Sequence, residues 1–67
     1  MKIRTLRRAN NLTQFELAEK VGVHRTAVTM WETGKSFPTT KTLIELARVF
    51  EVPLDELIKA DKDGSDK

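Results

Sequence analysis

Four residues, Arg25, Thr26, Thr29 and Met30, are spaced so that one face of a helix would carry them all. This face has one cation and is otherwise uncharged, whereas surface helices usually carry Lys and Glu, which favour the helix more than Thr does. In the major groove of DNA, Arg can form two hydrogen bonds with guanine, and Thr and Met can contact a thymine methyl group. The four residues are therefore candidate base-reading residues.

The elements that must position this face lie between Thr13 and Gly34. Thr13 and Glu16 have the spacing of a capping box, in which each side chain bonds the backbone amide of the other residue. Gly22 follows one helical segment and Gly34 follows the next, and glycine ends helices readily because it accepts the left-handed conformation. The sequence thus predicts two short helices, whose inner faces carry Leu17, Ala18 and Val21, and Ala27, Val28 and Trp31.

The motif TQ-x-ELA-x-KVGV, followed by V-x-x-WE-x-GK and a proline, resembles the helix-turn-helix of the Cro/repressor-like (XRE) family of bacterial and phage transcription regulators. The resemblance extends from about Leu6 to Leu57. It implies a lambda-repressor-like DNA-binding domain. It also implies a transcription regulator, specifically a repressor, that reads an inverted-repeat operator in double-stranded DNA through the major groove. A small helical bundle without this function is the plain alternative. The matching positions are Gln14, Leu17, Ala18, Gly22, Val23, Val28, Trp31, Glu32 and Gly34.

The resemblance also implies roles for single residues. In the family, the positions of Arg25, Thr26, Thr29 and Met30 contact bases, although Arg25 could instead bind only a phosphate. An arginine at the position of Arg7 commonly pairs with the glutamate that ends the recognition helix, which implies a structural ion pair with Glu32; in the alternative, both are simply solvated. Arg4 and Arg8 are either flanking DNA contacts or solvated. The positions that match phosphate-binding residues of the family are Thr13, Gln14, Thr33 and Lys35.

Three further helices are expected at residues 2–9, 40–50 and 54–58. They complete an all-α fold, a compact bundle of five short helices over residues 1–58, followed by a disordered charged tail over residues 59–67. The inner face of the 40–50 helix is expected to carry Leu43, Ile44, Ala47 and Phe50. Phe37 is expected to fill the gap between the third and fourth helices. Phe15 is expected to pack on the first helix or, alternatively, to contact a partner.

Length and composition exclude several classes of protein. A chain of 67 residues is one domain with little room for a substrate cleft. It has no Cys and one His, His24, so we expect neither a metal site nor a cofactor. No nucleophile and base stand together as an enzyme requires. No apolar run approaches the length of a membrane span, and a cytoplasmic location without membrane contact is expected.

The charge is distributed unevenly along the chain. Residues 1–41 have eight Lys and Arg and three acidic residues, a net +5, while residues 42–67 have four basic and seven acidic residues, a net −3. One half could face a polyanion while the other half is turned away from it. A mixed, solvated surface would give the same totals.

Partners other than DNA are suggested by the second half of the chain. Family members usually bind DNA as two-fold dimers, and no separate dimerisation domain fits in 67 residues. A homodimer contact would use apolar residues of the second half, unless all of these belong to the core of one protomer. A different class of function is a protein-interaction module, such as the antitoxin of a toxin–antitoxin pair or a regulator held by a small protein antagonist. The candidate dimer residues are Phe50, Val52, Leu54, Leu57 and Ile58.

Overall fold

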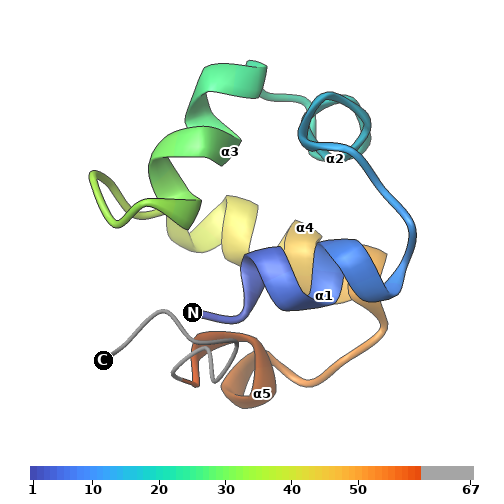
Figure 1. Ribbon diagram of the computed structural model, residues 1–67. Helices are drawn as coiled ribbons and strands as arrows, with labels where there is room; N and C mark the ends of the chain where they lie inside the picture. The colour runs from blue at the N-terminus through green and yellow to red at the C-terminus, as the bar shows by residue number, and fades with distance from the viewer. Residues whose placement is uncertain (60–67) are drawn as a thin grey trace.

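The computed structural model describes residues 1–59, and five α-helices without strands make up this part of the chain (Figure 1). The prediction of an all-α bundle of five short helices is confirmed. The tail expected after the last helix lies, apart from Lys59, outside the described residues. The helices are α1 (Ile3–Ala9), α2 (Gln14–Val21), α3 (Arg25–Glu32), α4 (Thr40–Phe50) and α5 (Leu54–Ile58).

Capping residues account for most of the helix ends. Thr13 Oγ1 accepts a hydrogen bond from the Glu16 amide at 3.0 Å, and the Thr13 amide donates to Glu16 Oε1 at 2.9 Å, so the predicted capping box opens α2. Gly22 ends α2 with φ of 74°, which is the left-handed conformation expected of it. His24 stands at the N-cap of α3 without a side-chain capping hydrogen bond. Helix α2 is therefore capped at both ends, whereas α3 lacks a side-chain cap at its start.

All five helices contribute to one hydrophobic core. On α4, Leu46 is fully buried while Ile44 is 48% exposed, so the expected inner face is wrong at Ile44. The true face is rotated toward Leu46 and Phe50 because α4 packs against both α2 and α5. The buried residues are Ile3, Leu17, Ala18, Val28, Trp31, Leu46, Phe50 and Leu57.

Two other expectations about apolar residues are corrected by this core. Phe50 and Leu57 are 5% and 0% exposed within one protomer, so their side chains are not available for a dimer contact. Phe37 is 74% exposed and does not fill the gap between α3 and α4. The following Pro38 is buried instead. The residue before a proline is held extended, and successive side chains of an extended segment point to opposite sides.

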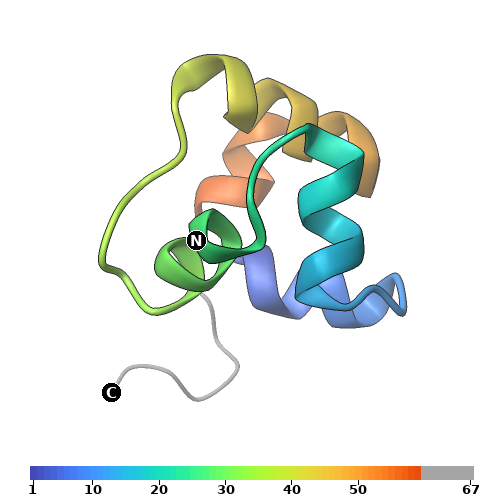
Figure 2. The same ribbon diagram turned by 90° about the horizontal axis from the view of Figure 1, so that it is seen from above.

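The helices lie so that α2 and α3 form one end of the molecule and α5 the other (Figure 1). The chain start is bound to α5, because the Lys2 amide donates to the Leu57 carbonyl at 2.9 Å and Lys2 Nζ lies 2.8 Å from Glu56 Oε2. The segment between α3 and α4 swings away from the helices as an open loop (Figure 2). In the described part of the chain, no helix is long and apolar enough to cross a membrane.

Candidate nucleic-acid interface

The orientation of α3 is set by its two buried residues. Val28 is 0% and Trp31 8% exposed, and both belong to the core. The opposite face therefore points outward, as the helical period requires. It exposes Arg25 and Thr26 to solvent and leaves Thr29 and Met30 half-buried. The four residues expected to read bases thus lie on one surface, with the accessible end at the first turn of α3.

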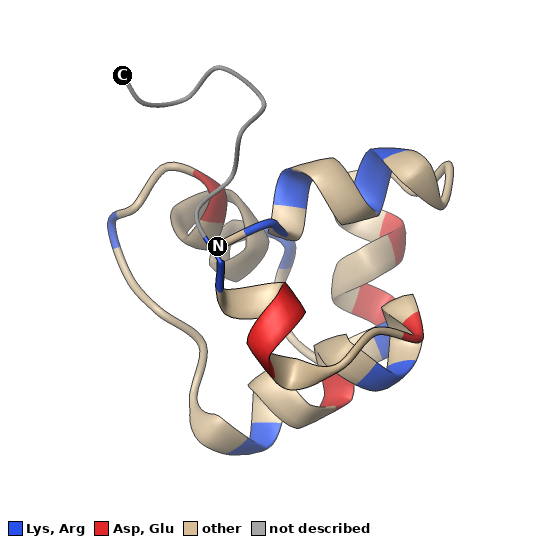
Figure 3. Ribbon diagram, turned by 90° about the horizontal axis from the view of Figure 1, so that it is seen from below, with Lys and Arg blue, Asp and Glu red and all other residues tan. Residues whose placement is uncertain are grey.

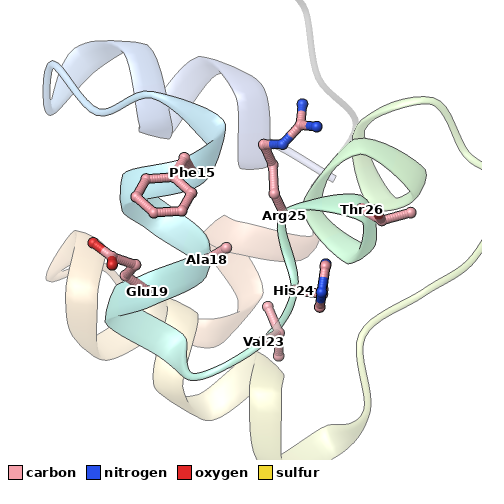
Figure 4. A pocket seen from close by; sticks show the side chains of 7 residues that line it. All are labelled: Phe15, Ala18, Glu19, Val23, His24, Arg25 and Thr26. Atoms are coloured by element: carbon pink, nitrogen blue, oxygen red, sulfur yellow. The ribbon is translucent and has the colours of Figure 1, made fainter.

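Arg25 is the cation of this surface. Within residues 1–59 its guanidinium has no hydrogen bond or ion pair, and its side chain extends outward from the first turn of α3 (Figure 4). The first turn of α3 has no acidic residue. An unpaired guanidinium at an exposed helix start is available to bind an anion or a guanine edge.

Glu32 joins α3 to α1. Its side chain is 1% exposed, and its Oε2 lies 2.7 Å from Arg7 Nε. Arg7 Nη2 donates to Glu32 Oε1 at 3.3 Å, while Arg7 Nη1 donates to the Leu12 carbonyl at 2.8 Å. The structure thus brings together Arg7 and Glu32, the two residues expected to pair. Because two nitrogens of the Arg7 guanidinium bind the carboxylate, its orientation is fixed. Arg4 Nε also reaches Glu32 Oε1, at 3.4 Å.

Burial alone would raise the pKa of Glu32, but hydrogen bonds from Arg7, Gln14 and Arg4 and the positive charge of Arg7 outweigh it. The pKa of Glu32 is consequently held below its ordinary value. The carboxylate is therefore ionised at neutral pH and acts as an acceptor for its three partners. This buried anion is neutralised internally and does not oppose an approaching polyanion.

Gln14 connects α2 to α3. Its Nε2 donates to Glu32 Oε1 at 3.0 Å, and its Oε1 accepts a hydrogen bond from Thr29 Oγ1 at 2.9 Å. Sequence reasoning placed Gln14 only among the phosphate-binding residues and did not find these contacts. The partners are 18 and 15 residues away, so no local spacing signals them and only the crossing of α2 and α3 brings them together.

The other residues expected to bind phosphate lie at the start of α2 and just after α3. Thr13 caps α2, and Lys35 is exposed in the loop after α3. The Thr33 hydroxyl donates to the Thr29 carbonyl at 2.9 Å, so its proton is directed back into the helix. Lys35 is thus the one cation of the four expected phosphate-binding residues and is exposed, whereas Thr33 offers only its oxygen lone pairs.

A shallow pocket of about 260 Å³ lies between α2 and the start of α3 (Figure 4). Phe15 is 55% exposed there. This exposure fits the alternative, a contact with a partner, better than packing on the first helix. The pocket walls come from α2, from the turn and from α3. Among the described residues, no group of three acidic, His or Cys side chains could hold a metal ion. The lining residues are Phe15, Ala18, Glu19, Val23, His24, Arg25 and Thr26.

The structure shows which cations of the basic first half are paired with acidic side chains and which are not. Seen from below, the acidic first turn of α5 faces the viewer, and the basic turns of α1 lie beside it (Figure 3). Lys2, Arg4 and Arg7 are bound to Glu56 or Glu32. The cations of the first half that have no hydrogen bond or ion pair among residues 1–59 are Lys20, Arg25, Lys35 and Lys41.

In this structure two short helices, α2 and α3, are joined by a turn at the left-handed Gly22. The sequence profile of the helix-turn-helix family matches residues 3–57. The chain belongs to the XRE-type helix-turn-helix family. No solved structure matches it significantly.

Relatives of this helix-turn-helix chain occur in bacteria and archaea. It is 41% identical over 61 residues to the HTH-type transcriptional activator BcrR of Enterococcus faecalis, covering 91% of the chain and 30% of BcrR. It is 36% identical to an uncharacterised HTH-type transcriptional regulator of Archaeoglobus fulgidus, covering 92% of the chain and 87% of that protein. It is 35% identical to the cryptic phage CTXphi transcriptional repressor RstR of Vibrio cholerae, covering 76% of the chain and 46% of RstR. The chain thus spans about a third of BcrR and under half of RstR.

Proposed function

We propose that this chain is a sequence-specific regulator that binds double-stranded DNA by placing α3 in the major groove. The observation that carries the proposal is the guanidinium of Arg25, which has no partner within residues 1–59, at the exposed first turn of α3. Side chains at the start of a recognition helix come nearest to base edges. Membership of the helix-turn-helix family supports it. Thr26, Thr29 and Met30 would complete the reading surface with methyl contacts and single hydrogen bonds.

Contacts to the DNA phosphate backbone on either side of the reading surface would fix the register of α3 on the duplex. Lys35, exposed in the loop after α3, would bind one phosphate as a point charge. Thr13, Gln14 and Thr33 would add polar contacts from the helix ends. Since Arg4 is held by Glu32, we place it in the structural cluster rather than among the DNA contacts.

The first experiment is selection of bound sequences from a random duplex library. Arg25→Ala is then compared with the native chain on the selected site and on scrambled DNA. We expect a loss of about 1–3 kcal/mol on the selected site and a relaxed preference at one G·C pair of each half-site. An equal loss on both DNAs would instead make Arg25 a phosphate contact.

Lys35→Ala is the matched control, because it removes a cation from the loop after α3 without changing the four residues of the reading face. Its affinity should fall by a similar factor on every sequence, and the slope of log affinity against log salt should decrease by about one per protomer. If neither variant alters binding, α3 is not the element that contacts DNA.

We propose repression as the regulatory outcome, with the protein acting on DNA in the cytoplasm. RstR is named a repressor and BcrR an activator, so the direction of regulation needs a direct test. A promoter with the selected site placed over its start, fused to a reporter, should be silenced by this chain. Increased reporter output from the native promoter would reverse the assignment.

A further inference from the structure

The amide group of Gln14 can lie in only one of its two orientations. One end of it lies 3.0 Å from Glu32 Oε1, and the pKa of Glu32 is lowered, so that oxygen can only accept. An amide oxygen in this place would set two acceptors against each other, and the NH₂ group must therefore face Glu32. The amide oxygen of Gln14 consequently faces Thr29.

This orientation directs the Thr29 hydroxyl proton inward. Thr29 Oγ1 lies 2.9 Å from Gln14 Oε1 and 3.4 Å from the Arg25 carbonyl oxygen. Both neighbours are acceptors, so the single hydroxyl proton is donated to one of them, and the shorter contact is the better hydrogen bond. What remains for a ligand at the outer face of α3 is the pair of lone pairs on the oxygen.

We propose that Thr29 is a specificity-determining residue that reads DNA only as a hydrogen-bond acceptor, and that Gln14 is the positioning residue that imposes this polarity. In the major groove, adenine N6 and cytosine N4 are donors, whereas guanine O6 and thymine O4 are acceptors. Thr29 therefore selects an amino base, A or C, over a keto base, G or T. This inference rests on the proposed function, since it assigns the chemistry of one contact within that interface.

The test measures affinity for four duplexes that differ only at the base pair where Thr29→Val changes binding most. The native chain should prefer A and C over G and T there by about three- to tenfold, the value of one net hydrogen bond. Thr29→Val keeps the shape but lacks the hydroxyl, and the preference should disappear. Thr29→Ser keeps the hydroxyl and should keep the preference. Arg25→Ala, which should alter a different base pair, is the matched control.

Gln14→Met tests the positioning role, because Met has a similar length and cannot accept the Thr29 proton strongly. The hydroxyl then keeps only the weaker 3.4 Å contact to the Arg25 carbonyl and can turn outward to donate to DNA, so the ratio between amino and keto bases should narrow. A loss of a mere phosphate contact would lower affinity for all four duplexes equally and leave this ratio unchanged. Thermal unfolding followed by circular dichroism checks that each variant is folded, and the Thr29 variants keep the test valid if Gln14→Met is not.

Three outcomes would overturn the inference. They are a keto preference in the native chain at the base pair that depends on Thr29, an unchanged preference in Thr29→Val at every position, and an unchanged amino-to-keto ratio in folded Gln14→Met. In each case specific DNA binding by the native chain is retained, so the proposed function stands. If the native chain selects no duplex at all, the proposed function fails and this inference fails with it.

Discussion

Glu32 holds three helices together through a single carboxylate. It ends α3 and accepts hydrogen bonds from Arg7 on α1 and Gln14 at the start of α2. A buried charge is tolerated only when it is paired and hydrogen-bonded. At the residue scale, the position of the reading surface therefore depends on the polar cluster of Glu32, Arg7, Arg4 and Gln14 as well as on the apolar core.

A double-mutant cycle tests the central pair of this cluster. Arg7→Ala and Glu32→Ala should each lower the free energy of unfolding by about 3 kcal/mol, because the remaining charge is left buried without its partner. The double variant should lose less than the sum of the single losses. Denaturant unfolding measures all four proteins. Strictly additive losses would show that the two side chains do not stabilise each other.

The control for that cycle is the exposed pair of Arg48 and Glu45, whose Nη1 and Oε2 atoms are 3.9 Å apart. The Arg48 side chain is 73% exposed. Arg48→Ala should change the free energy of unfolding by less than about 1 kcal/mol, since solvent screens such pairs. A loss equal to that of Arg7→Ala would show that burial is not what makes the Glu32 pair matter.

Acid should weaken the same cluster. The folded-state pKa of Glu32 lies below its ordinary value of 4.5, so its ionised form stabilises the fold. This stabilisation is fully present above pH 4.5 and is lost as the pH falls through the lower, folded-state pKa. The difference in stability between the native chain and Glu32→Gln should therefore shrink below about pH 4.5. Thermal unfolding from pH 7 to pH 3 measures it, and a difference independent of pH would contradict it.

At the element scale, two helices end in the left-handed conformation with different residues. Gly22 ends α2 at φ 74°, and Glu51 ends α4 at φ 58°. A Cβ atom added at Gly22 would meet no atom within 4 Å, so only backbone strain opposes a side chain there. Glu51 already bears this strain, because residues with a Cβ are disfavoured in the left-handed region.

Opposite substitutions should therefore have opposite effects. Gly22→Ala should lower the free energy of unfolding by roughly 1 kcal/mol or more, and Glu51→Gly should raise it by a smaller amount, because glycine also gains freedom in the unfolded chain. Chemical denaturation of the two variants measures both changes. Gly22→Asn is the matched control and should cost less than Gly22→Ala, since Asn tolerates this conformation better. Equal losses for Asn and Ala would contradict the explanation by strain.

At the scale of the whole molecule, the potential DNA surface and the exposed apolar residues of α5 are at different ends. Figure 1 places α2 and α3 opposite α5. Of the apolar residues expected to join two protomers, Leu54 and Ile58 are 41% and 51% exposed. The molecule measures 30 × 23 × 23 Å, so two copies could lie side by side on successive turns of DNA, which are about 34 Å apart.

We expect two protomers to bind an inverted repeat whose half-site centres lie about one turn apart, with an affinity that falls steeply as salt rises. Sedimentation of the complex on the selected site measures the number of protomers. Ile58→Ser should weaken the binding of the second protomer. Phe37→Ser, which changes a side chain that is 74% exposed on the loop after α3, should leave the number of protomers unchanged. One protomer per site at saturation would contradict the dimer.

The sequence by itself determined the helices and their ends. Capping residues, glycines and apolar spacing act over a few residues, so the capping box at Thr13 and the left-handed Gly22 could be predicted without the fold. The family motif also depends on local spacing and indicated the outward face of α3, and the resemblance to the family implied the pairing of Arg7 with Glu32. These features were predicted because the interactions behind them are local or are carried by the motif.

Only the tertiary structure decided which apolar residues are buried and which polar groups meet. Whether Ile44 or Leu46 enters the core depends on the rotation of α4 against its neighbours, and helical periodicity allows both when the apolar stripe is broad. Phe15 and Phe37 are 55% and 74% exposed because no element among residues 1–59 covers them. The hydrogen bond from Thr29 to Gln14 joins residues 15 positions apart. Such a contact forms only when α2 and α3 cross at the angle that the core imposes, and a sequence pattern does not contain that angle.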